Sequence, residues 1–313
     1  MRASSLLVVV LSASCAGWMD QFTLPVSLVL ILVLGIPHGA TDHRMFYSLA
    51  DTQQQKAALH KKWFYVYYIG LMLLCGVVWY FFPISSFLLF LLVSAYHFGQ
   101  LNLNTAEWPE SPLKQLTSVV SGLFVLSVPL LSHADVAIPI VESMLHLRIP
   151  AAEIRPYFTL LALCSGFCYG AFLLILSLTA RAPRKVLLRE LVNWMFLFAL
   201  FYYAPLLLGF SVYFSIWHAL PSMRDQVAFY RQRQPDYRLK NYVLEMLPYS
   251  LLSLSVLLFC AQFISEKPLS EQLALLFAGI AMVTLPHVLL MDWLYSMPTA
   301  ITTAKRETTS CPA

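Results

Sequence analysis

The sequence predicts an all-α fold, a polytopic transmembrane bundle of about ten helices, some of them short, with both termini in the cytoplasm. Its 313 residues are 59% hydrophobic and only 12% charged, whereas a soluble globular chain carries roughly 25% charged residues. The mean hydropathy is +0.70. Apolar runs of about 20 residues recur along the chain, which is typical of membrane spans. We therefore expect one integral membrane domain over 1–313, in which 301–313 form a flexible C-terminal tail.

Ten apolar runs, separated by polar residues or prolines, are the expected helices. The first run has two interpretations, a cleaved signal peptide or a first span. We expect a span, because a second run follows almost at once and the small-residue cleavage signal is poor. In chain order, the expected helices cover 3–18, 23–37, 63–82, 84–99, 114–131, 157–180, 187–204, 206–220, 243–264 and 271–291.

Several of these runs are shorter than the roughly 20 residues of a full crossing. Short spans indicate tilt, local thinning of the bilayer or half-helices around a cavity. Prolines stand at or near many run ends, where proline is best tolerated. Pro205 alone separates the seventh run from the eighth, so this division needs independent support.

The basic residues supply that support. If the ten helices alternate in direction, 17 of the 20 Lys and Arg residues lie on one side of the membrane. The other three are Arg148, Arg155 and Lys267. The positive-inside rule predicts such an asymmetry and makes the basic side cytoplasmic. Joining the runs around Pro205 would move the basic segment 224–240 to the other side. We expect that segment to be a cytoplasmic loop at anionic lipid rather than a nucleic-acid site.

Four histidines occupy matched positions in this arrangement. His38, His97 and His218 end the second, fourth and eighth runs, and His287 lies in the last third of the tenth. Even-numbered runs cross in the same direction, so all four imidazoles reach the cytoplasmic side. A single histidine near a helix end is usually a capping residue, but four at one membrane depth indicate function. Neutral imidazole suits iron, copper, zinc and nickel, so the sequence predicts a metal site.

Polar side chains follow all four histidines at short range, with Asp225 seven residues after His218 and Asp292 five after His287. Asp42 comes four residues after His38, Gln100 three after His97, and Ser222 four after His218. Histidines that bind a metal usually donate their second N–H to a carboxylate or carbonyl oxygen. We therefore expect Asp42, Gln100 and Ser222 beside the metal ligands; the alternative is that they are ordinary interfacial polar residues.

Aromatic residues surround the same positions, and they have two interpretations. Aromatic belts form at membrane interfaces, while a long apolar substrate is held by aromatic walls. The sequence alone does not separate the two. If a substrate binds here, the expected contacts are Tyr96, Phe98, Phe214 and Trp217.

Motifs of several other enzyme classes are missing. The chain has no G-x-S-x-G, Walker loop, G-x-G-x-x-G or H-E-x-x-H motif, which argues against the corresponding hydrolases, nucleotide-binding proteins and metalloproteases. The eight-histidine pattern of membrane di-iron desaturases is also missing. The six cysteines form no C-x-x-C pair and are expected to be small buried thiols.

Four stretches around these histidines resemble the Brp/Blh family of bacterial and archaeal membrane proteins. They read P-H-G-A-T-D-H over 37–43, S-A-Y-H-F-G-Q over 94–100, W-H-A-L-P-S over 217–222 and L-P-H-V-L-L over 285–290. The resemblance implies a beta-carotene 15,15'-dioxygenase that uses ferrous iron, Fe(2+), and dioxygen to split beta-carotene into two retinals. It implies that His38, His97 and His218 bind the iron. It also implies a functional link to a retinal-binding rhodopsin, since the family includes the bacteriorhodopsin-associated protein.

The chain departs from the family pattern at one position. The third motif of the family, H-x-x-x-H, has a second histidine where this chain has Ser222. A hydroxyl is a poor substitute for an imidazole on ferrous iron. Either His287 or a water fills the fourth place, or this chain has drifted from the family reaction.

Two other functions fit the same residues. A membrane transporter for an apolar or small ionic solute would place histidines along its pathway, and inverted internal repeats would favour it. We see no such repeat. A different metal-dependent lipid oxygenase is the third candidate, because its metal site would need the same histidines.

Overall fold

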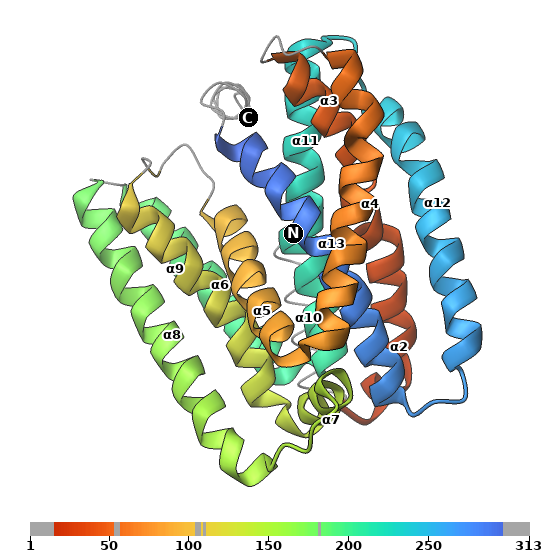
Figure 1. Ribbon diagram of the computed structural model, residues 1–313. Coiled ribbons are helices and arrows are strands. Elements are labelled where there is room, and N and C mark those ends of the chain that lie inside the picture. Colours follow the sequence, from red (N-terminus) through yellow and green to blue (C-terminus); the bar gives the residue numbers. More distant parts are fainter. Residues whose placement is uncertain (1–15, 53–56, 104–107, 109–110, 181–182, 297–313) are drawn as a thin grey trace. The chain divides into compact units, whose positions relative to one another are not determined.

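The computed structural model describes residues 16–296, apart from 53–56, 104–107, 109–110 and 181–182 (Figure 1). Within these residues the chain is helical and has no strand. Nine helical stretches of the described chain are long and apolar enough to cross a membrane. They coincide with the second to tenth predicted runs, which confirms the all-α transmembrane fold. Most of the first run, 3–18, lies outside the described residues, as does the tail at 301–313.

Twelve α-helices and three short π or 3₁₀ segments make up the described chain. The division at Pro205 is confirmed, because one helix ends at Tyr203 and the next begins at Leu206. The α-helices are α2 (Ala16–Leu30), α3 (Asp42–Thr52), α4 (Ala57–Phe81), α5 (Pro83–Asn102), α6 (Pro112–Ser132), α7 (Ala134–Leu145), α8 (Ala151–Thr179), α9 (Arg184–Tyr203), α10 (Leu206–Val212), α11 (Leu220–Arg233), α12 (Leu239–Ile264) and α13 (Leu269–Ser296). The other segments are the π-helices η1 (Ile31–Gly35) and η3 (Tyr213–Ala219) and the 3₁₀-helix η2 (Ile36–Gly39).

Two elements differ from the sequence-based expectation. The helix α7 was not predicted, and it ends where His146 adopts a left-handed backbone with a φ of 53°. The second difference is that helical structure continues beyond Pro221 to Arg233 instead of stopping at 220. Pro221 is tolerated because it is the second residue of α11, directly after a π-helix, where the ordinary α-helical hydrogen-bond ladder is already interrupted. The first part of the basic segment is therefore helical, and it buries Gln226 and Tyr230.

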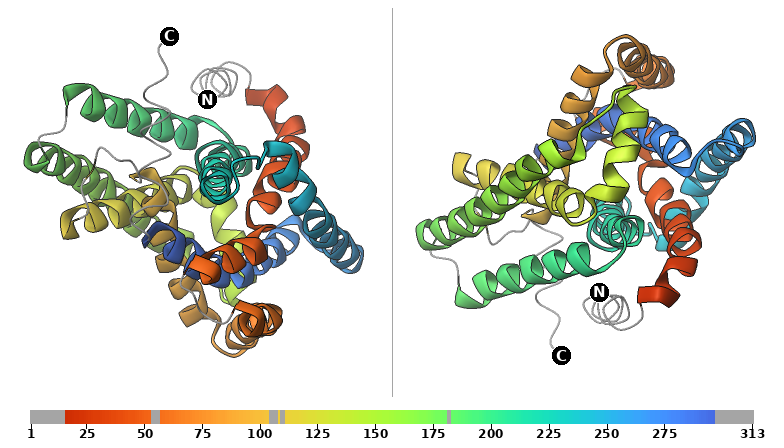
Figure 2. Two further views of the ribbon diagram at one scale, coloured as in Figure 1. Left: turned by 90° about the horizontal axis from the view of Figure 1, so that it is seen from above. Right: turned by 90° about the horizontal axis from the view of Figure 1, so that it is seen from below.

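The chain forms two compact units, each assembled from segments that are distant in sequence. The first unit comprises residues up to Gly35 together with Ser94–Ala219, and the second comprises Ile36–Val93 and the chain from Leu220 onward. In the first unit, α6 packs along α8 and α2 packs against α10 (Figures 1 and 2). Its main core includes Phe98, Phe124, Phe201 and Tyr213.

The second unit contains η2, α3, α4, the first half of α5, α11, α12 and α13. The helix α13 packs against both α4 and α3, and the core between them includes Met45, Leu49, Tyr230 and Met291. Arg44 of α3 ties two further helices to this core. Its guanidinium forms an ion pair with Glu245 of α12 at 2.7 Å and donates to Gln234, just beyond α11, at 2.9 Å. These contacts fix the start of α3.

The outward faces of the helices have the character expected of surfaces in lipid. Along α12 the one buried residue is Tyr242, while large apolar side chains such as Leu252 and Phe259 are 63% and 61% exposed. Apolar surface of this extent is unfavourable in water, and a lipid environment removes that cost. The helices therefore belong to a multi-pass membrane protein.

Small residues let α5 and α6 approach until their backbones touch. Ala95 and Gly99 of α5 face Ser118 and Gly122 of α6. A Cβ on Gly99 would overlap the carbonyl of Ser118, and one on Gly122 would overlap the carbonyl of Ala95. Pairs of small residues four apart are a common way for membrane helices to pack closely. This contact fixes the part of α5 that carries His97.

We expect Gly99→Ala to destabilise the protein. The added methyl group has no room, and overpacking of this kind costs about 1–3 kcal/mol or more, which lowers the melting temperature by roughly 2–4 °C for each kcal/mol. Thermal unfolding of the purified protein in detergent measures the effect. The matched control is Gly70→Ala in α4, where a Cβ would meet no atom within 4 Å. Equal melting temperatures for the two variants would contradict the close contact of α5 and α6.

Candidate metal centre: two buried histidine pairs

All four predicted histidines are buried. The exposed fractions of His38, His97, His218 and His287 are 9%, 4%, 1% and 4%. Each lies on a helical segment that is long and apolar enough to span a membrane. Ionisable side chains in such places are costly and usually functional. The structure arranges them as two pairs, one in each unit.

The first pair is His97 and His218. Their ring centres are 4.7 Å apart and their planes meet at 77°. His97 lies in the last two turns of α5, beside the close contact with α6. His218 lies in the π-helix η3. A π-helical turn widens the backbone and turns its side chains away from the α-helical positions, and such turns are frequent at functional sites.

Aromatic rings lie beside this pair. Phe214 stacks on the His218 ring at 5.4 Å and an interplanar angle of 14°. Phe98 meets the same ring edge-on at 4.9 Å and 84°. Trp217 is partly buried against the same core, while the hydroxyl of Tyr96 accepts a hydrogen bond from Gln100 at 3.3 Å. Phe98 and Phe214, two of the predicted wall residues, are therefore in ring contact with His218.

The second pair is His38 and His287. Their ring centres are 4.8 Å apart and their planes meet at 83°. His38 belongs to the 3₁₀-helix η2, directly after Pro37, and His287 follows Pro286 within α13. Both prolines precede their histidine by one residue, so each imidazole sits where the regular helical hydrogen-bond pattern is weakened.

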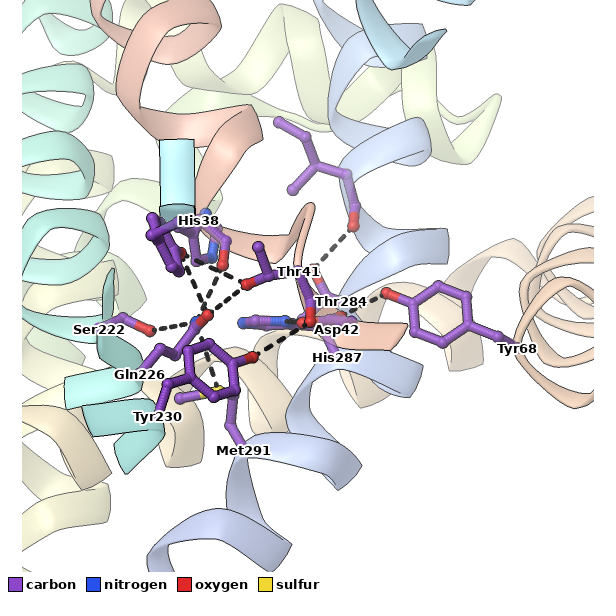
Figure 3. A network of polar contacts seen from close by, with 12 residues as sticks. His38, Thr41, Asp42, Tyr68, Ser222, Gln226, Tyr230, Thr284, His287 and Met291 are labelled. Atoms are coloured by element: carbon purple, nitrogen blue, oxygen red, sulfur yellow. Dashed lines mark hydrogen bonds and ion pairs between the residues drawn. The ribbon is translucent and has the colours of Figure 1, made fainter. Parts of the chain in front are cut away.

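Asp42 orients the second pair. Both of its carboxylate oxygens lie 3.0 Å from Nδ1 of His287, and one of them accepts the Tyr68 hydroxyl at 2.7 Å (Figure 3). A carboxylate accepts the Nδ1–H, which places the proton of neutral His287 on Nδ1 and its lone pair on Nε2. A carboxylate bound to the second nitrogen is the usual arrangement for a histidine that binds a metal.

The partner of Asp42 differs from the one its position in the sequence indicated. The spacing of four residues placed it beside His38, as on one face of an α-helix. The chain from His38 to Asp42 is instead a 3₁₀ turn followed by the first residue of α3, so the four-residue periodicity does not apply. The carboxylate points to His287 of α13 instead.

The other two predicted neighbours have different partners. Gln100 donates to Tyr96, four residues earlier on α5. Ser222 accepts a long hydrogen bond of 3.4 Å from Gln226, one turn later on α11. Sequence reasoning missed Gln226, Thr41 and Tyr68, because an uncharged polar residue in an apolar helix carries no pattern that distinguishes it from an interfacial one.

The spacing within each pair fits a shared metal ion. Two imidazoles at neighbouring positions of one ion, with nitrogens about 2.0–2.1 Å from it, hold their ring centres roughly 4.5–5 Å apart. Both pairs have this spacing, and Asp42 leaves Nε2 of His287 as the nitrogen with the lone pair. Across residues 16–296, where described, no group of three or more His, Cys, Asp or Glu side chains has the geometry of a metal site. The structure thus brings the four histidines together as two pairs.

Comparison with known proteins decides the family. A sequence model described as "Beta-carotene 15,15'-dioxygenase" matches residues 29–295. The chain belongs to this family. The match includes all four histidines and Asp42, and it confirms the resemblance seen in the sequence motifs.

Two curated relatives of the beta-carotene 15,15'-dioxygenase family match over most of their lengths. One, named beta-carotene 15,15'-dioxygenase, comes from the uncultured marine bacterium 66A03; it is 26% identical over 277 residues, which are 86% of this chain and 93% of the relative. The other is the probable beta-carotene 15,15'-dioxygenase Blh of Halobacterium salinarum, 23% identical over 84% of this chain and 81% of its own. No solved structure matches this chain.

Proposed function

We propose that this protein is a membrane-embedded non-haem iron dioxygenase. It would cleave the central double bond of beta-carotene, placing one oxygen atom of dioxygen on each carbon of that bond, so that one carotene and one O2 give two molecules of all-trans-retinal. The family match over residues 29–295 carries the proposal. The buried histidine pairs support it, because oxygen chemistry on an apolar polyene needs a metal or another cofactor.

The proposed ligands of ferrous iron are His38, His97, His218 and His287. When bound, ferrous iron supplies the activation of dioxygen for the cleavage. The neutral nitrogen donors of imidazole suit this metal. Because Ser222 is bonded to Gln226 within α11, we assign the fourth place to His287, whose Nε2 is the nitrogen prepared for binding by Asp42.

The protein's own residues would position the substrate and hold the proton of His287. Asp42 keeps the proton of His287 on Nδ1. The rings of Phe98 and Phe214 form apolar walls beside His218, with Tyr96 and Trp217 as further proposed contacts. Such walls exclude water and select which double bond of a long polyene is held in place, a positioning effect that contributes strongly to catalysis.

The proposed location is the bacterial cell inner membrane, with the metal site toward the cytoplasm. The distribution of Lys and Arg supports this orientation. A carotenoid is nearly insoluble in water, and so we propose that it enters from the lipid bilayer. The retinal product would serve a retinal-binding rhodopsin.

Gly35→Ala is expected to slow cleavage by displacing Phe214. A Cβ on Gly35 would lie 2.7 Å from Cε1 of Phe214, which is too close, so we expect the ring to shift from its position on His218. Misplacing a positioning group by about 1 Å costs up to roughly 10²-fold in rate. Retinal formation in membranes, with iron content measured in parallel, tests this. Gly170→Ala is the control, since a Cβ there would meet no atom within 4 Å. Equal activity of both variants would show that Phe214 does not position the substrate.

The proposed function is tested in a bacterium that makes beta-carotene. Expression of this chain should bleach the orange colour and produce retinal, and His38→Ala should abolish both effects. Lasting colour without retinal, with the protein verified in the membrane, would refute the proposal. Ser222→His asks in addition whether restoring the family's histidine raises activity.

A further inference from the structure

Gln226 of α11 is the most fully bonded buried amide beside the second histidine pair. Its side chain is 0% exposed. Its oxygen accepts the hydroxyls of Thr41 at 2.6 Å and of Tyr242 at 3.1 Å. Its nitrogen donates to the backbone carbonyl of His38 at 3.0 Å (Figure 3), with a longer contact to Ser222 at 3.4 Å. A third, weaker contact of the nitrogen is to Sδ of Met291 at 3.9 Å. The hydrogen bonds on both sides fix the position and the direction of this amide.

The amide bonds to the turn that carries the site at two points, the backbone carbonyl of His38 and the side-chain hydroxyl of Thr41. Its nitrogen donates a hydrogen bond to the carbonyl of His38, which lies in the 3₁₀-helix η2. Its oxygen accepts the hydroxyl of Thr41, the residue before Asp42. Asp42 in turn contacts His287. Gln226 therefore contacts His38 directly through its backbone carbonyl. It is connected to His287 indirectly, through Thr41 and the neighbouring Asp42.

We infer that Gln226 is a positioning residue for the His38–His287 pair and thereby for the iron that these histidines would bind. This inference rests on the proposed function, since it concerns the same iron. An irregular turn between a π-helix and α3 lacks the continuous hydrogen-bond ladder that holds a helical histidine in place. The Gln226 amide supplies that restraint from a neighbouring helix, and outer partners of this kind typically change metal affinity by 10–100-fold.

The chemistry of the network makes the test specific. Gln226→Glu preserves the size and shape of the side chain but removes the N–H that holds the His38 carbonyl. Thr41→Val preserves the branched shape and removes the closest hydroxyl donor. Tyr242→Phe removes the longer of the two donors and leaves the His38 contact in place. We expect the loss of metal affinity to be largest for Gln226→Glu, smaller for Thr41→Val and smallest for Tyr242→Phe.

The measurement is anaerobic titration of the full-length protein in detergent with ferrous iron, together with thermal unfolding of the iron-free protein. Gln226→Glu should weaken iron binding by about 10–100-fold. The control is Gln272→Glu, which makes the same chemical change at an exposed amide that donates to the carbonyls of Ser265 and Lys267. The control should bind iron as the unmodified protein does.

The outcomes separate this inference from the proposed function. If the unmodified protein binds no ferrous iron, both are overturned. If it binds iron and Gln226→Glu binds it equally well, or if the variant changes only the unfolding temperature, Gln226 is a structural residue and the inference alone fails. If Gln226→Glu does not accumulate in the membrane, the same iron titration is made with Thr41→Val. An unchanged iron affinity of Thr41→Val would then overturn the inference.

Discussion

Replacing His97 or His218 with alanine is expected to abolish retinal formation and iron binding together. Both imidazoles are buried, and their rings are 4.7 Å apart, so each substitution would remove one of the nitrogens proposed to bind the iron. The loss of iron affinity should exceed the roughly 10–100-fold loss that follows removal of a residue hydrogen-bonded to a metal ligand. Retinal formation and iron content of the purified variants measure it.

The control for these variants is His146→Asn. His146 is exposed and has a left-handed backbone with a φ of 53°, a conformation that asparagine tolerates well. The control should retain both activity and iron. His218→Gln, which keeps much of the side-chain volume, separates loss of a ligand from loss of packing. Full activity in either alanine variant would exclude that histidine from the site.

The second large effect is expected for Asp42→Asn. The carboxylate accepts the Nδ1–H of His287 and the hydroxyl of Tyr68, whereas an asparagine can turn its NH2 group toward Nδ1. His287 would then carry its proton on Nε2, the nitrogen assigned to the metal. We expect iron affinity to fall by about 10–100-fold, with a matching loss of activity at limiting iron.

Tyr68→Phe provides the graded comparison for Asp42→Asn. It removes one hydrogen bond of 2.7 Å to Asp42 and leaves the contact between Asp42 and His287 in place. Its iron affinity should therefore lie between those of the unmodified protein and Asp42→Asn. An Asp42→Asn variant that binds iron normally would contradict the assignment of His287 as a ligand.

The lengths of the apolar runs were sufficient to predict the nine described helical stretches that could span a membrane. The second to tenth runs coincide with spans, and the division at Pro205 is present because proline cannot continue the ladder of α9. The predicted end of the eighth run, at residue 220, was wrong, because helical structure continues to Arg233. Polar residues after Pro221 resembled a loop, but Gln226 and Tyr230 are buried by helices distant in sequence.

The site was predicted less completely than the helices. The four histidines are buried, and Phe98 and Phe214 contact His218, while their roles in binding a metal and a substrate stay predictions. The partner of Asp42 could not be predicted, because His287 is 245 residues away in the chain. The π-helix at Tyr213–Ala219 also has no sequence signal that we recognise, although it determines where His218 points.

The most direct test of the account is the metal content and metal environment of the protein. The chain is purified anaerobically, reconstituted with ferrous iron and studied by metal analysis and X-ray absorption. We predict stoichiometric iron with imidazole nitrogens about 2.0–2.2 Å away, lost in His38→Ala and in His97→Ala. No bound iron, or an unchanged nitrogen environment in both variants, would contradict the claim that these buried histidines form an iron site.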